Sequence, residues 1–347
     1  MTTTQKTRYL STTQLHIGYK HKSRETCVAR TPEMEICSGD FICLLGPNGT
    51  GKSTLIRTLS GIQAPLKGAV QLNNQPLDQL SPRERARKVS VVLTEIPSPG
   101  MLDAYSLVAL GRHPYSGRFG ILGQKDRERI AWAFQAVDAS NLENRQVAQL
   151  SDGERQKLLI ARALAQETPL MLLDEPTAFL DLPRQIELMV TLRKLAGQEQ
   201  MGILLSTHNL DLALRFADRI WLLHKDGTIM QGYPEELVVN GEISHTFSSK
   251  EAKWQVERGT FSIQTNPKLR AMVQGNGSLS FWTRQALERL GFTIEEEAES
   301  SSSIMIVKVN QTEQQTKWLV DYNDRKKHFD SIGSFINWVS STRIMPY

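Results

Sequence analysis

Residues 46–54 read Gly46-Pro47-Asn48-Gly49-Thr50-Gly51-Lys52-Ser53-Thr54, and this stretch decides how the rest of the chain is interpreted. It follows a short apolar run, Phe41–Leu45, that is typical of a buried strand, and it precedes Leu55–Leu59, which has helical character. The glycines allow a tight backbone curl because they tolerate conformations that side chains exclude. The order strand, glycine-rich loop, helix therefore predicts a loop whose backbone N–H groups converge beside a helix N-terminus.

The loop matches the spacing G-x-x-x-x-G-K-[ST], which is typical of phosphate-binding loops. Converging N–H groups and the dipole of the following helix both favour a bound phosphate. The pattern assigns Lys52 to the β- and γ-phosphates of a nucleotide and the Ser53 hydroxyl to a magnesium ion. A chance turn is the alternative, and the flanking strand and helix disfavour it. The predicted nucleotide-binding residues are Gly46, Pro47, Asn48, Gly49, Thr50, Gly51, Lys52, Ser53 and Thr54.

A second apolar run, Leu170–Leu173, ends in two carboxylates, Asp174 and Glu175. A strand of this kind places Asp174 at its C-terminal edge, where the carboxylate can hold the magnesium shell. Glu175 then lies where it could act on an attacking water as a base or positioning group. Taken alone, such an ending is more often a plain strand terminus. Together with the phosphate-binding loop, it indicates nucleotide hydrolysis.

Between these two motifs, Leu150-Ser151-Asp152-Gly153-Glu154-Arg155-Gln156 begins a predicted helix that extends to about Gln166. Ser151 is a suitable N-cap, so an ordinary capped helix is one interpretation. Ahead of the carboxylate strand, however, the pattern Leu-Ser-x-Gly-x-x-Gln resembles the signature of ABC-type ATPases. This family usually has glycine where Asp152 stands and glutamine where Glu154 stands.

The resemblance covers roughly residues 8 to 250 and implies roles for further residues. Tyr19 resembles the aromatic residue that stacks on adenine, and Asp181 resembles the D-loop aspartate that reaches across a dimer. His208 follows the predicted strand Ile203–Leu205 and resembles the switch histidine that contacts the γ-phosphate. Glu95 stands where the family normally has a glutamine that senses magnesium, and a carboxylate there could still coordinate the metal.

The resemblance also implies a mechanism in which two copies form a head-to-tail dimer around two ATP molecules. Ser151 and Gly153 of one protomer would complete the phosphate site of the other. ATP binding would close the dimer and hydrolysis would open it, because the two states bind nucleotide with different affinity. The implied catalytic residues are Lys52, Glu175 and His208, and the implied magnesium ligands are Ser53, Asp174 and Glu95.

Alternating apolar runs and helix-period segments predict an α/β fold for the first two thirds of the chain. We expect a P-loop NTPase domain of the ABC type at residues 8–250, with a helical subdomain between the two nucleotide motifs. The segment Ser98–Gly123 is rich in glycine and proline, which favours irregular structure. Further predicted strands are Val89–Leu93, Ile203–Leu205 and Ile220–Leu223, the last followed by an Asp-Gly turn, and the predicted helix is Asp126–Val137.

The remaining residues, 260–347, are expected to form a small separate α/β domain. Predicted strands are Arg270–Val273, Ile304–Val309 and Trp318–Tyr322, and predicted helices are Phe281–Leu290 and Ser331–Ser340. The stretch Val273–Ser278 predicts a strand, a glycine turn and a helix. A plain tight turn is favoured there over a ligand site. The hypothesis for this domain is a regulatory or dimer-stabilising role.

Composition excludes several other classes. The net charge of +4 on 347 residues is too small to indicate nucleic-acid binding. Three cysteines without paired spacing indicate neither a disulfide framework nor a zinc site, and they fit a reducing compartment. The N-terminus lacks the apolar core of a secretory signal, and apolar runs stay short of the roughly 20 residues that a membrane span needs. A cytoplasmic location is expected.

Within the ABC family, Leu110–Tyr115 and Tyr233–Leu237 resemble importers of iron-siderophores, haem or cobalamin. The implied partners are transmembrane permease subunits and, indirectly, an extracytoplasmic substrate-binding protein, with this chain at the cytoplasmic face of the membrane. The alternative is a soluble ABC-class ATPase such as an iron–sulfur assembly factor. DNA-repair members would need a long coiled coil, translation members usually have two cassettes, and a GTPase would need an Asn-Lys-x-Asp segment.

Overall fold

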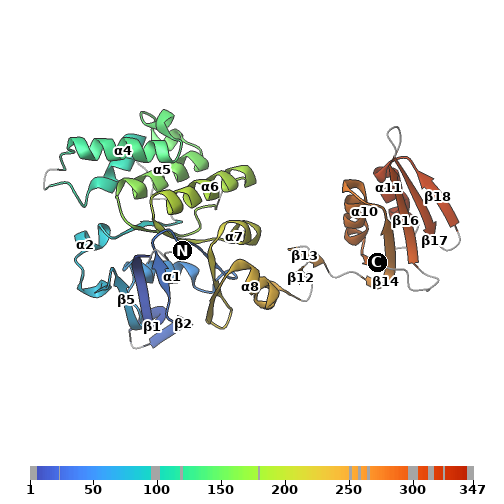
Figure 1. Cartoon of the computed structure of the whole chain (residues 1–347), viewed down its shortest axis with the longest axis horizontal. Helices are drawn as coiled ribbons and strands as arrows, with labels where there is room; N and C mark the ends of the chain where they lie inside the picture. The colour runs from blue at the N-terminus through green and yellow to red at the C-terminus, as the bar shows by residue number, and fades with distance from the viewer. Residues whose placement is uncertain are drawn as a thin grey trace, which may run out of the picture. The chain divides into compact units, whose positions relative to one another are not determined.

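The computed structural model describes residues 6–22, 24–94, 102–117, 120–178, 180–249, 252–256, 259–263, 266–295, 304–311, 316–322 and 325–341. The predicted metal ligand Glu95 lies outside these residues. The chain divides into two compact units, Met1–Phe247 and Ser248–Tyr347 (Figure 1). Among the described residues, none of the helices combines the length and the apolar character that crossing a bilayer requires.

A six-stranded sheet forms the centre of the first unit. Its strands are β4 (Phe41–Leu45), β7 (Val89–Val92), β8 (Leu170–Leu173), β9 (Gly202–Ser206), β10 (Arg219–Leu223) and β11 (Ile229–Gly232). The order is β11-β10-β4-β9-β8-β7, with β11 antiparallel to β10 and the other neighbours parallel. Strands β4, β8 and β9 are buried throughout, which explains their unbroken apolar sequences. The strands that the sequence predicts here are confirmed, and their carboxyl ends share one edge.

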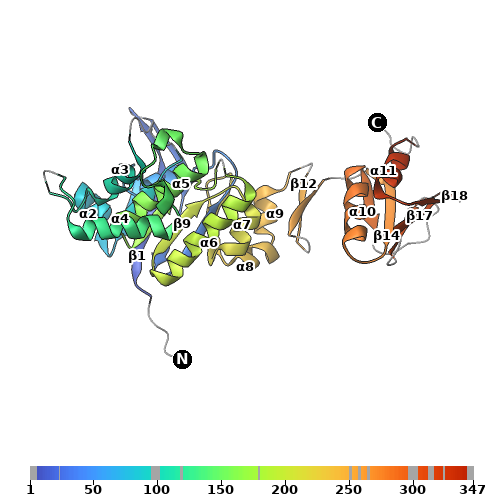
Figure 2. The same cartoon turned by 90° about the horizontal axis from the view of Figure 1, so that it is seen from above.

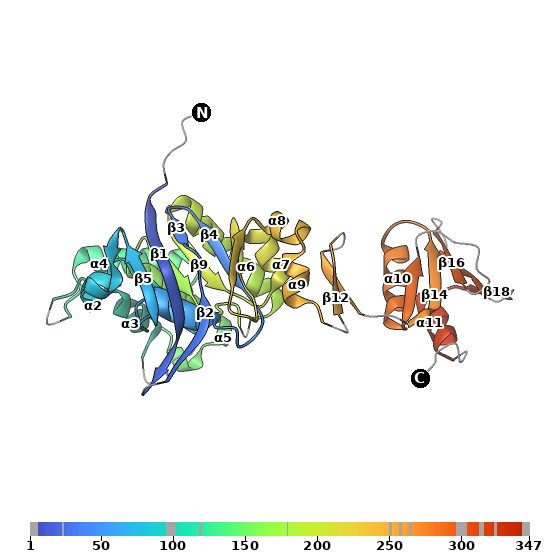
Figure 3. The same cartoon turned by 90° about the horizontal axis from the view of Figure 1, so that it is seen from below.

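A second, antiparallel sheet packs its apolar side chains into the same core, and the sequence analysis did not anticipate it. It contains β1 (Arg8–His21), β2 (Arg24–Arg30), β3 (Glu35–Cys37), β5 (Lys67–Leu72) and β6 (Gln75–Pro76). Figure 3 shows β1, β2 and β5 side by side. Leu10, Leu15 and Ile17 of β1 are fully buried against the helix that follows the phosphate-binding loop and its neighbours.

Helices surround the central sheet, and three of them form a separate packed group. The helices are α1 (Lys52–Leu59), α2 (Pro82–Ala86), α3 (Ala104–Ala109), α4 (Gln124–Ala136), α5 (Asp152–Ala165), α6 (Leu182–Gln198), α7 (Leu210–Phe216), α8 (Pro234–Val239) and α9 (Glu242–Phe247). Short 3₁₀ turns are η1 (Leu77–Gln79), η2 (Leu110–Arg112), η3 (Ser140–Leu142) and η4 (Val147–Gln149). Helices α3, α4 and α5 pack on one another and form the expected helical subdomain (Figure 1).

The expectation of irregular structure between Ser98 and Gly123 is wrong for residues 104–112, which form α3 and η2. Asp103 caps α3, since its Oδ1 accepts a hydrogen bond of 2.7 Å from the Ser106 backbone N–H. The glycine and proline content of the surrounding segment concealed this short capped helix.

Arg112 explains why the stretch Leu110–Tyr115 is ordered. Its side chain is 2% exposed and donates to Asp126 of α4 at 2.8 Å and to Glu167 at 3.0 Å. It also donates to the Ala165 carbonyl at the end of α5, at 2.7 Å, and it stacks on Tyr115. One guanidinium therefore ties η2 to both long helices of the helical subdomain.

The second unit is an α/β fold in its own right, as the sequence predicts. Its elements are β12 (Ala252–Gln255), β13 (Thr260–Ile263), β14 (Asn266–Gln274), α10 (Ser278–Arg289), β15 (Phe292–Glu295), β16 (Ile304–Gln311), β17 (Thr316–Tyr322), β18 (Arg325–Phe329) and α11 (Ile332–Ser341). The main sheet has the order β15-β14-β16-β17-β18, and β12 and β13 form a hairpin. Figure 2 shows α10 and α11 beside this sheet. Their Leu287, Phe335 and Val339 share its core.

Replacing Arg112 by alanine should destabilise the first unit by about 3 kcal/mol, because it leaves two carboxylates without their buried cation. Chemical denaturation of the full chain, followed by circular dichroism and fitted with one transition per unit, measures this loss. Lys125→Ala, on the exposed surface of α4, serves as the control and should unfold like the parent protein. Equal free energies of unfolding for the first unit in the Arg112→Ala and Lys125→Ala variants would contradict the role given to Arg112.

Candidate functional site

The loop between β4 and α1 has the curled backbone that the glycine spacing predicts. Gly49 and Gly51 adopt φ angles of 77° and 107°, which side chains rarely tolerate. A Cβ atom on Gly51 would also lie 2.3 Å from a methyl group of Val28. Both observations show why these positions are glycine: the loop must turn steeply before α1 begins at Lys52. The backbone N–H groups of the loop lie at the N-terminus of this helix, where an anion is favoured.

Lys52 is folded back over this loop. Its ammonium group donates to the carbonyl oxygens of Gly46 and Pro47, at 2.9 and 3.1 Å. Burial lowers the pKa of Lys52, while the nearby Glu175 and Asp174 carboxylates oppose that effect. A lysine that is 5% exposed and held by two carbonyls is positioned at the mouth of the loop, where a polyphosphate could meet it.

Asp174 lies directly after β8 and connects three strand ends. Its Oδ1 accepts hydrogen bonds from the Ser53 hydroxyl at 3.0 Å and from the Ser206 hydroxyl at 2.8 Å. Ser206 ends β9 and also accepts the backbone N–H of Glu175, at 2.9 Å. The hydroxyl of Thr94, beyond β7, donates to the Asp174 carbonyl at 2.9 Å. Hydroxyl and carboxylate oxygens are the ligands that Mg²⁺ prefers, so Ser53 and Asp174 fit a magnesium site.

Glu175 and His208 face each other across this edge of the sheet. His208 Nε2 lies 2.5 Å from Glu175 Oε1. Glu175 has φ 51°, an uncommon backbone conformation for a residue with a side chain, and one that is enriched at functional sites. The pair is partly exposed, which leaves it accessible to a substrate. A carboxylate beside an imidazole can accept a proton from water and orient it.

Tyr19 reaches the same region from β1. Its hydroxyl lies 2.8 Å from the Thr54 hydroxyl of α1, and the side chain is 51% exposed. The phosphate-binding loop and the predicted adenine-stacking residue are therefore neighbours. An exposed aromatic ring beside the loop offers a flat surface for a base.

Ser151 and Gly153 lie elsewhere, at the N-terminus of α5. The Ser151 hydroxyl donates to Glu154 Oε2 at 2.8 Å, and the two residues form a capping box that lowers the pKa of Glu154. Asp152 pairs with Arg155 at 2.6 Å. Within the described part of the chain, hydrogen bonds do not connect Ser151 or Gly153 to residues 46–54. One protomer thus keeps this segment apart from its own phosphate-binding loop.

Asp181 caps α6, accepting the Arg184 backbone N–H at 3.1 Å. Gln185, one turn along this helix, donates to the Leu180 carbonyl at 2.9 Å and accepts from Asn209 at 3.0 Å. Asn209 is in turn the cap of α7 and follows His208 directly. These hydrogen bonds connect Leu180, next to Asp181, with Asn209, next to His208. The sequence alone does not indicate this link.

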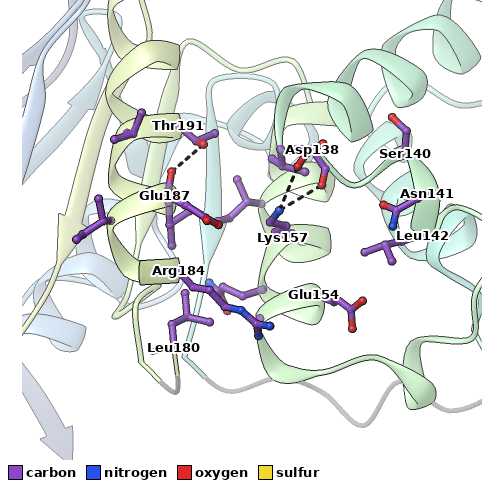
Figure 4. A pocket seen from close by; sticks show the side chains of 17 residues that line it. Asp138, Ser140, Asn141, Leu142, Glu154, Lys157, Leu180, Arg184, Glu187 and Thr191 are labelled. Atoms are coloured by element: carbon purple, nitrogen blue, oxygen red, sulfur yellow. Dashed lines mark hydrogen bonds and ion pairs between the residues drawn. The ribbon is translucent and has the colours of Figure 1, made fainter. Parts of the chain in front are cut away.

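A cavity of about 800 Å³ lies between α5 and α6 (Figure 4). Glu154 and Arg184 line one end, Lys157 with its ion-pair partner Asp138 lines the other, and Gly153 is also among the lining residues. Lys52, Asp174 and Glu175 are not among the lining residues. This cavity is therefore separate from the phosphate-binding loop.

Sequence reasoning missed two hydroxyl groups at the site, those of Ser206 and Thr94. Both stand at or just after the end of a parallel strand, at the edge where Asp174 lies. The presence of polar residues at the ends of predicted strands could have indicated these hydroxyl groups, because the carboxyl ends of neighbouring parallel strands meet at one edge of the sheet. Their pairing with Asp174 required the strand order, which the sequence does not state.

Comparison with known proteins finds a family match in each of the two units. The model of the family described as ABC transporter matches residues 30–178. The family described as iron ABC transporter C-terminal domain matches residues 268–340, in the second unit.

Individual relatives agree with these matches. An uncharacterized ABC transporter ATP-binding protein of Methanocaldococcus jannaschii is 40% identical over 74% of this chain and 88% of its own length. The ferric enterobactin transport ATP-binding protein of Escherichia coli is 37% identical over 65% of this chain and 82% of its own length. A dimeric cassette solved in a post-hydrolysis state with ADP and Pi is similar over 65% of this chain and 98% of its own, with a TM-score of 0.57 and 27% identity. This chain belongs to the ATP-binding proteins of ABC transporters and is an ATPase of that family.

Proposed function

We propose that this ATPase powers the import of iron-siderophore complexes or related metal chelates across a membrane. The observation that supports the proposal most strongly is the match of residues 268–340 to a domain described from iron ABC transporters. The ATP-binding unit resembles proteins named for ferric enterobactin transport and for iron(3+)-hydroxamate import, the latter 35% identical over 69% of this chain and from Bacillus subtilis. The soluble-ATPase alternative lacks comparable support.

We further propose the following roles at the nucleotide site. The loop N–H groups and Lys52 hold the phosphates, and Tyr19 stacks on the base. Ser53 and Asp174 hold the magnesium ion, which neutralises charge on the phosphates when bound. Ser206 keeps the Asp174 carboxylate turned toward Ser53 through its 2.8 Å hydrogen bond. Glu175 accepts a proton from the attacking water, and His208 orients Glu175 from 2.5 Å away.

The second half of each site comes from another copy of the chain. Ser151 and Gly153 lie apart from the phosphate-binding loop of their own protomer, and similar cassettes are dimeric. In the proposed dimer they approach the γ-phosphate of the partner, and Asp181 lies at the same interface. Binding of ATP then stabilises the closed dimer, and hydrolysis removes that stabilisation.

Permease subunits in the membrane are the proposed partners, with a substrate-binding protein on the outer side acting through them. The chain itself would be peripheral, on the cytoplasmic face. Closure of the dimer would move the permease, because a ligand that binds one state more tightly shifts the equilibrium toward it. Recovery of a multi-span membrane protein with the native complex tests this placement; exclusively soluble partners would contradict it.

Glu175→Gln should reduce ATP turnover by about 10²–10⁴-fold while ATP still binds, because an amide cannot take the proton from water. The ATP-bound dimer should accumulate, since hydrolysis no longer opens it. Phosphate release and size-exclusion chromatography with Mg·ATP measure the two effects.

Two further variants complete this test. Lys52→Ala should lose both ATP binding and hydrolysis, whereas Glu199→Gln, an exposed carboxylate at the end of α6, should behave as the parent protein. Turnover by Glu175→Gln at the parental rate would show that another group activates the water.

Glu154→Gln should strengthen ATP-dependent dimerisation roughly fivefold. Glutamine keeps the capping box with Ser151 and removes a negative charge beside the hydroxyl that meets the partner's γ-phosphate. Two unit charges about 4 Å apart in water interact by about 1 kcal/mol, which corresponds to this factor. Analytical ultracentrifugation over a range of ATP concentrations measures the dimer fraction, with Glu128→Gln on α4 as the control. Unchanged or weaker dimerisation of Glu154→Gln would show that the charge of Glu154 does not oppose the ATP-dependent dimer.

For the second unit we propose a regulatory or dimer-stabilising role. Its core of Leu287, Val307, Trp318 and Phe335 is independent of the first unit's core. Its Trp318 Nε1 donates to Thr283 at 2.8 Å, which satisfies the buried indole. An independently packed domain can respond to a ligand or partner without disturbing the ATPase core.

Truncation after Ser249 tests this role better than truncation after Gly259, because β12 pairs with β13 and should be removed with it. We expect the shortened chain to bind ATP normally but to form the ATP-dependent dimer several-fold less well, with altered ATPase rate. Leu287→Asp, which disrupts only the second core, should reproduce the effect in the full chain. Parental dimerisation and ATPase in both proteins would exclude the role.

A further inference from the structure

Three metal-ligating side chains meet at the end of the first unit, outside the nucleotide site. His224 follows β10 directly, and Glu242 and His245 stand three residues apart on α9. That spacing places both on one face of the helix. The ligand atoms of all three side chains lie within 4.8 Å of one another. Ligand atoms about 2.0–2.2 Å from a tetrahedral zinc lie roughly 3.4 Å apart, so small side-chain rotations would bring this cluster to coordination distance.

Hydrogen bonds determine which ring nitrogen of His224 is free. The Thr246 hydroxyl donates to the Glu242 carbonyl at 2.8 Å, which uses its only proton. The same hydroxyl lies 2.8 Å from His224 Nδ1, so it must accept the hydrogen there and Nδ1 must be protonated. In neutral His224 the lone pair is therefore on Nε2. Metal-binding histidines are typically oriented in this way, by a hydrogen bond from the ring nitrogen that does not bind the ion.

That lone pair is enclosed and unused. His224 is 5% exposed, and its Nε2 has no hydrogen-bond partner among the described residues. An oxygen of the Glu242 carboxylate, which is also an electron-pair donor, lies 3.8 Å from this nitrogen. The His245 ring lies on the same side, with its centre 5.6 Å from the centre of the His224 ring. A single cation placed among these three side chains would be within reach of the His224 lone pair, the Glu242 carboxylate and a ring nitrogen of His245.

We propose that His224, Glu242 and His245 bind a divalent transition-metal ion of the zinc class. Two imidazoles and one carboxylate suit such ions, whereas Mg²⁺ and Ca²⁺ prefer oxygen ligands alone. His245 is exposed and Glu242 is partly exposed, so an ion can enter from solvent and retain water at its remaining position.

The ion would connect α9 to the turn between β10 and β11. Leu222 of β10 pairs with Leu45, the last residue before the phosphate-binding loop, and His224 comes two residues later. Helix α9 is the last element of the first unit. The metal site therefore fixes the end of the ATPase unit to the strand that borders the phosphate-binding loop. It does not depend on which compound is transported.

Isothermal titration of ZnCl₂ into the untagged, EDTA-treated full chain without nucleotide tests the proposal. We expect one Zn²⁺ per chain, and excess Mg²⁺ should not displace it. His245→Ala and Glu242→Gln should each weaken binding at least 10-fold, and Thr246→Val, which removes the orienting hydroxyl, about 10-fold. His113→Ala, an exposed histidine of the helical subdomain, should bind as the parent protein does.

Asp174→Asn separates this site from the nucleotide site and should retain Zn²⁺ binding. Circular dichroism of each variant shows whether a lost affinity reflects unfolding, and His245→Ala changes an exposed side chain that the fold does not need. Absence of Zn²⁺ binding to the parent protein, equal binding by His245→Ala and Glu242→Gln, or loss of binding in Asp174→Asn would each overturn the proposal.

Discussion

The Asp174 carboxylate is the group on which the nucleotide site depends. It ends one parallel strand, accepts the hydroxyl of Ser206 from the end of the next, and accepts the hydroxyl of Ser53 from the helix after a third. A buried carboxylate is costly unless donors satisfy it, and here two hydroxyl groups do. Those donors are also what align the phosphate-binding loop with the two carboxylates. The order of the parallel strands therefore determines the geometry of the site.

The two surfaces that ATP would join in the proposed dimer are organised by separate parts of the first unit. The phosphate-binding loop, Asp174 and Glu175 belong to the central sheet, whereas Ser151 and Gly153 start a helix of the helical subdomain. Arg112 holds that subdomain together through both of its long helices. The stretch Leu110–Tyr115, which resembles importer sequences, thus helps to hold the helix that begins after Ser151 in place. In the proposed dimer, coupling of hydrolysis to transport would depend on how these two parts of neighbouring copies approach each other.

A neighbouring strand of the same sheet leads to a different kind of chemistry. Strand β10 lies next to β4, and the residue after it, His224, presents an unsatisfied ring nitrogen to Glu242 and His245. The zinc-class site proposed there and the nucleotide site use neighbouring strands but different ligands: two imidazole nitrogens and one carboxylate oxygen at the first, and oxygen atoms alone at the second. A single sheet can therefore position two cations of different classes without competition between them.

The sequence alone determined the local features: the curl of residues 46–54, the buried strands, the cap at Ser151 and the two-part organisation of the chain. Each depends on neighbours within a few residues, so its pattern is visible in one dimension. Only the tertiary structure decided that Ser206 and Thr94 bind Asp174, that β1 opens a second sheet, and that Glu242 and His245 face His224. Those contacts join residues far apart in the chain, and strand order and helix packing determine them. Hydrogen bonds and burial act through space, so such contacts produce no regular spacing in the sequence that would predict them.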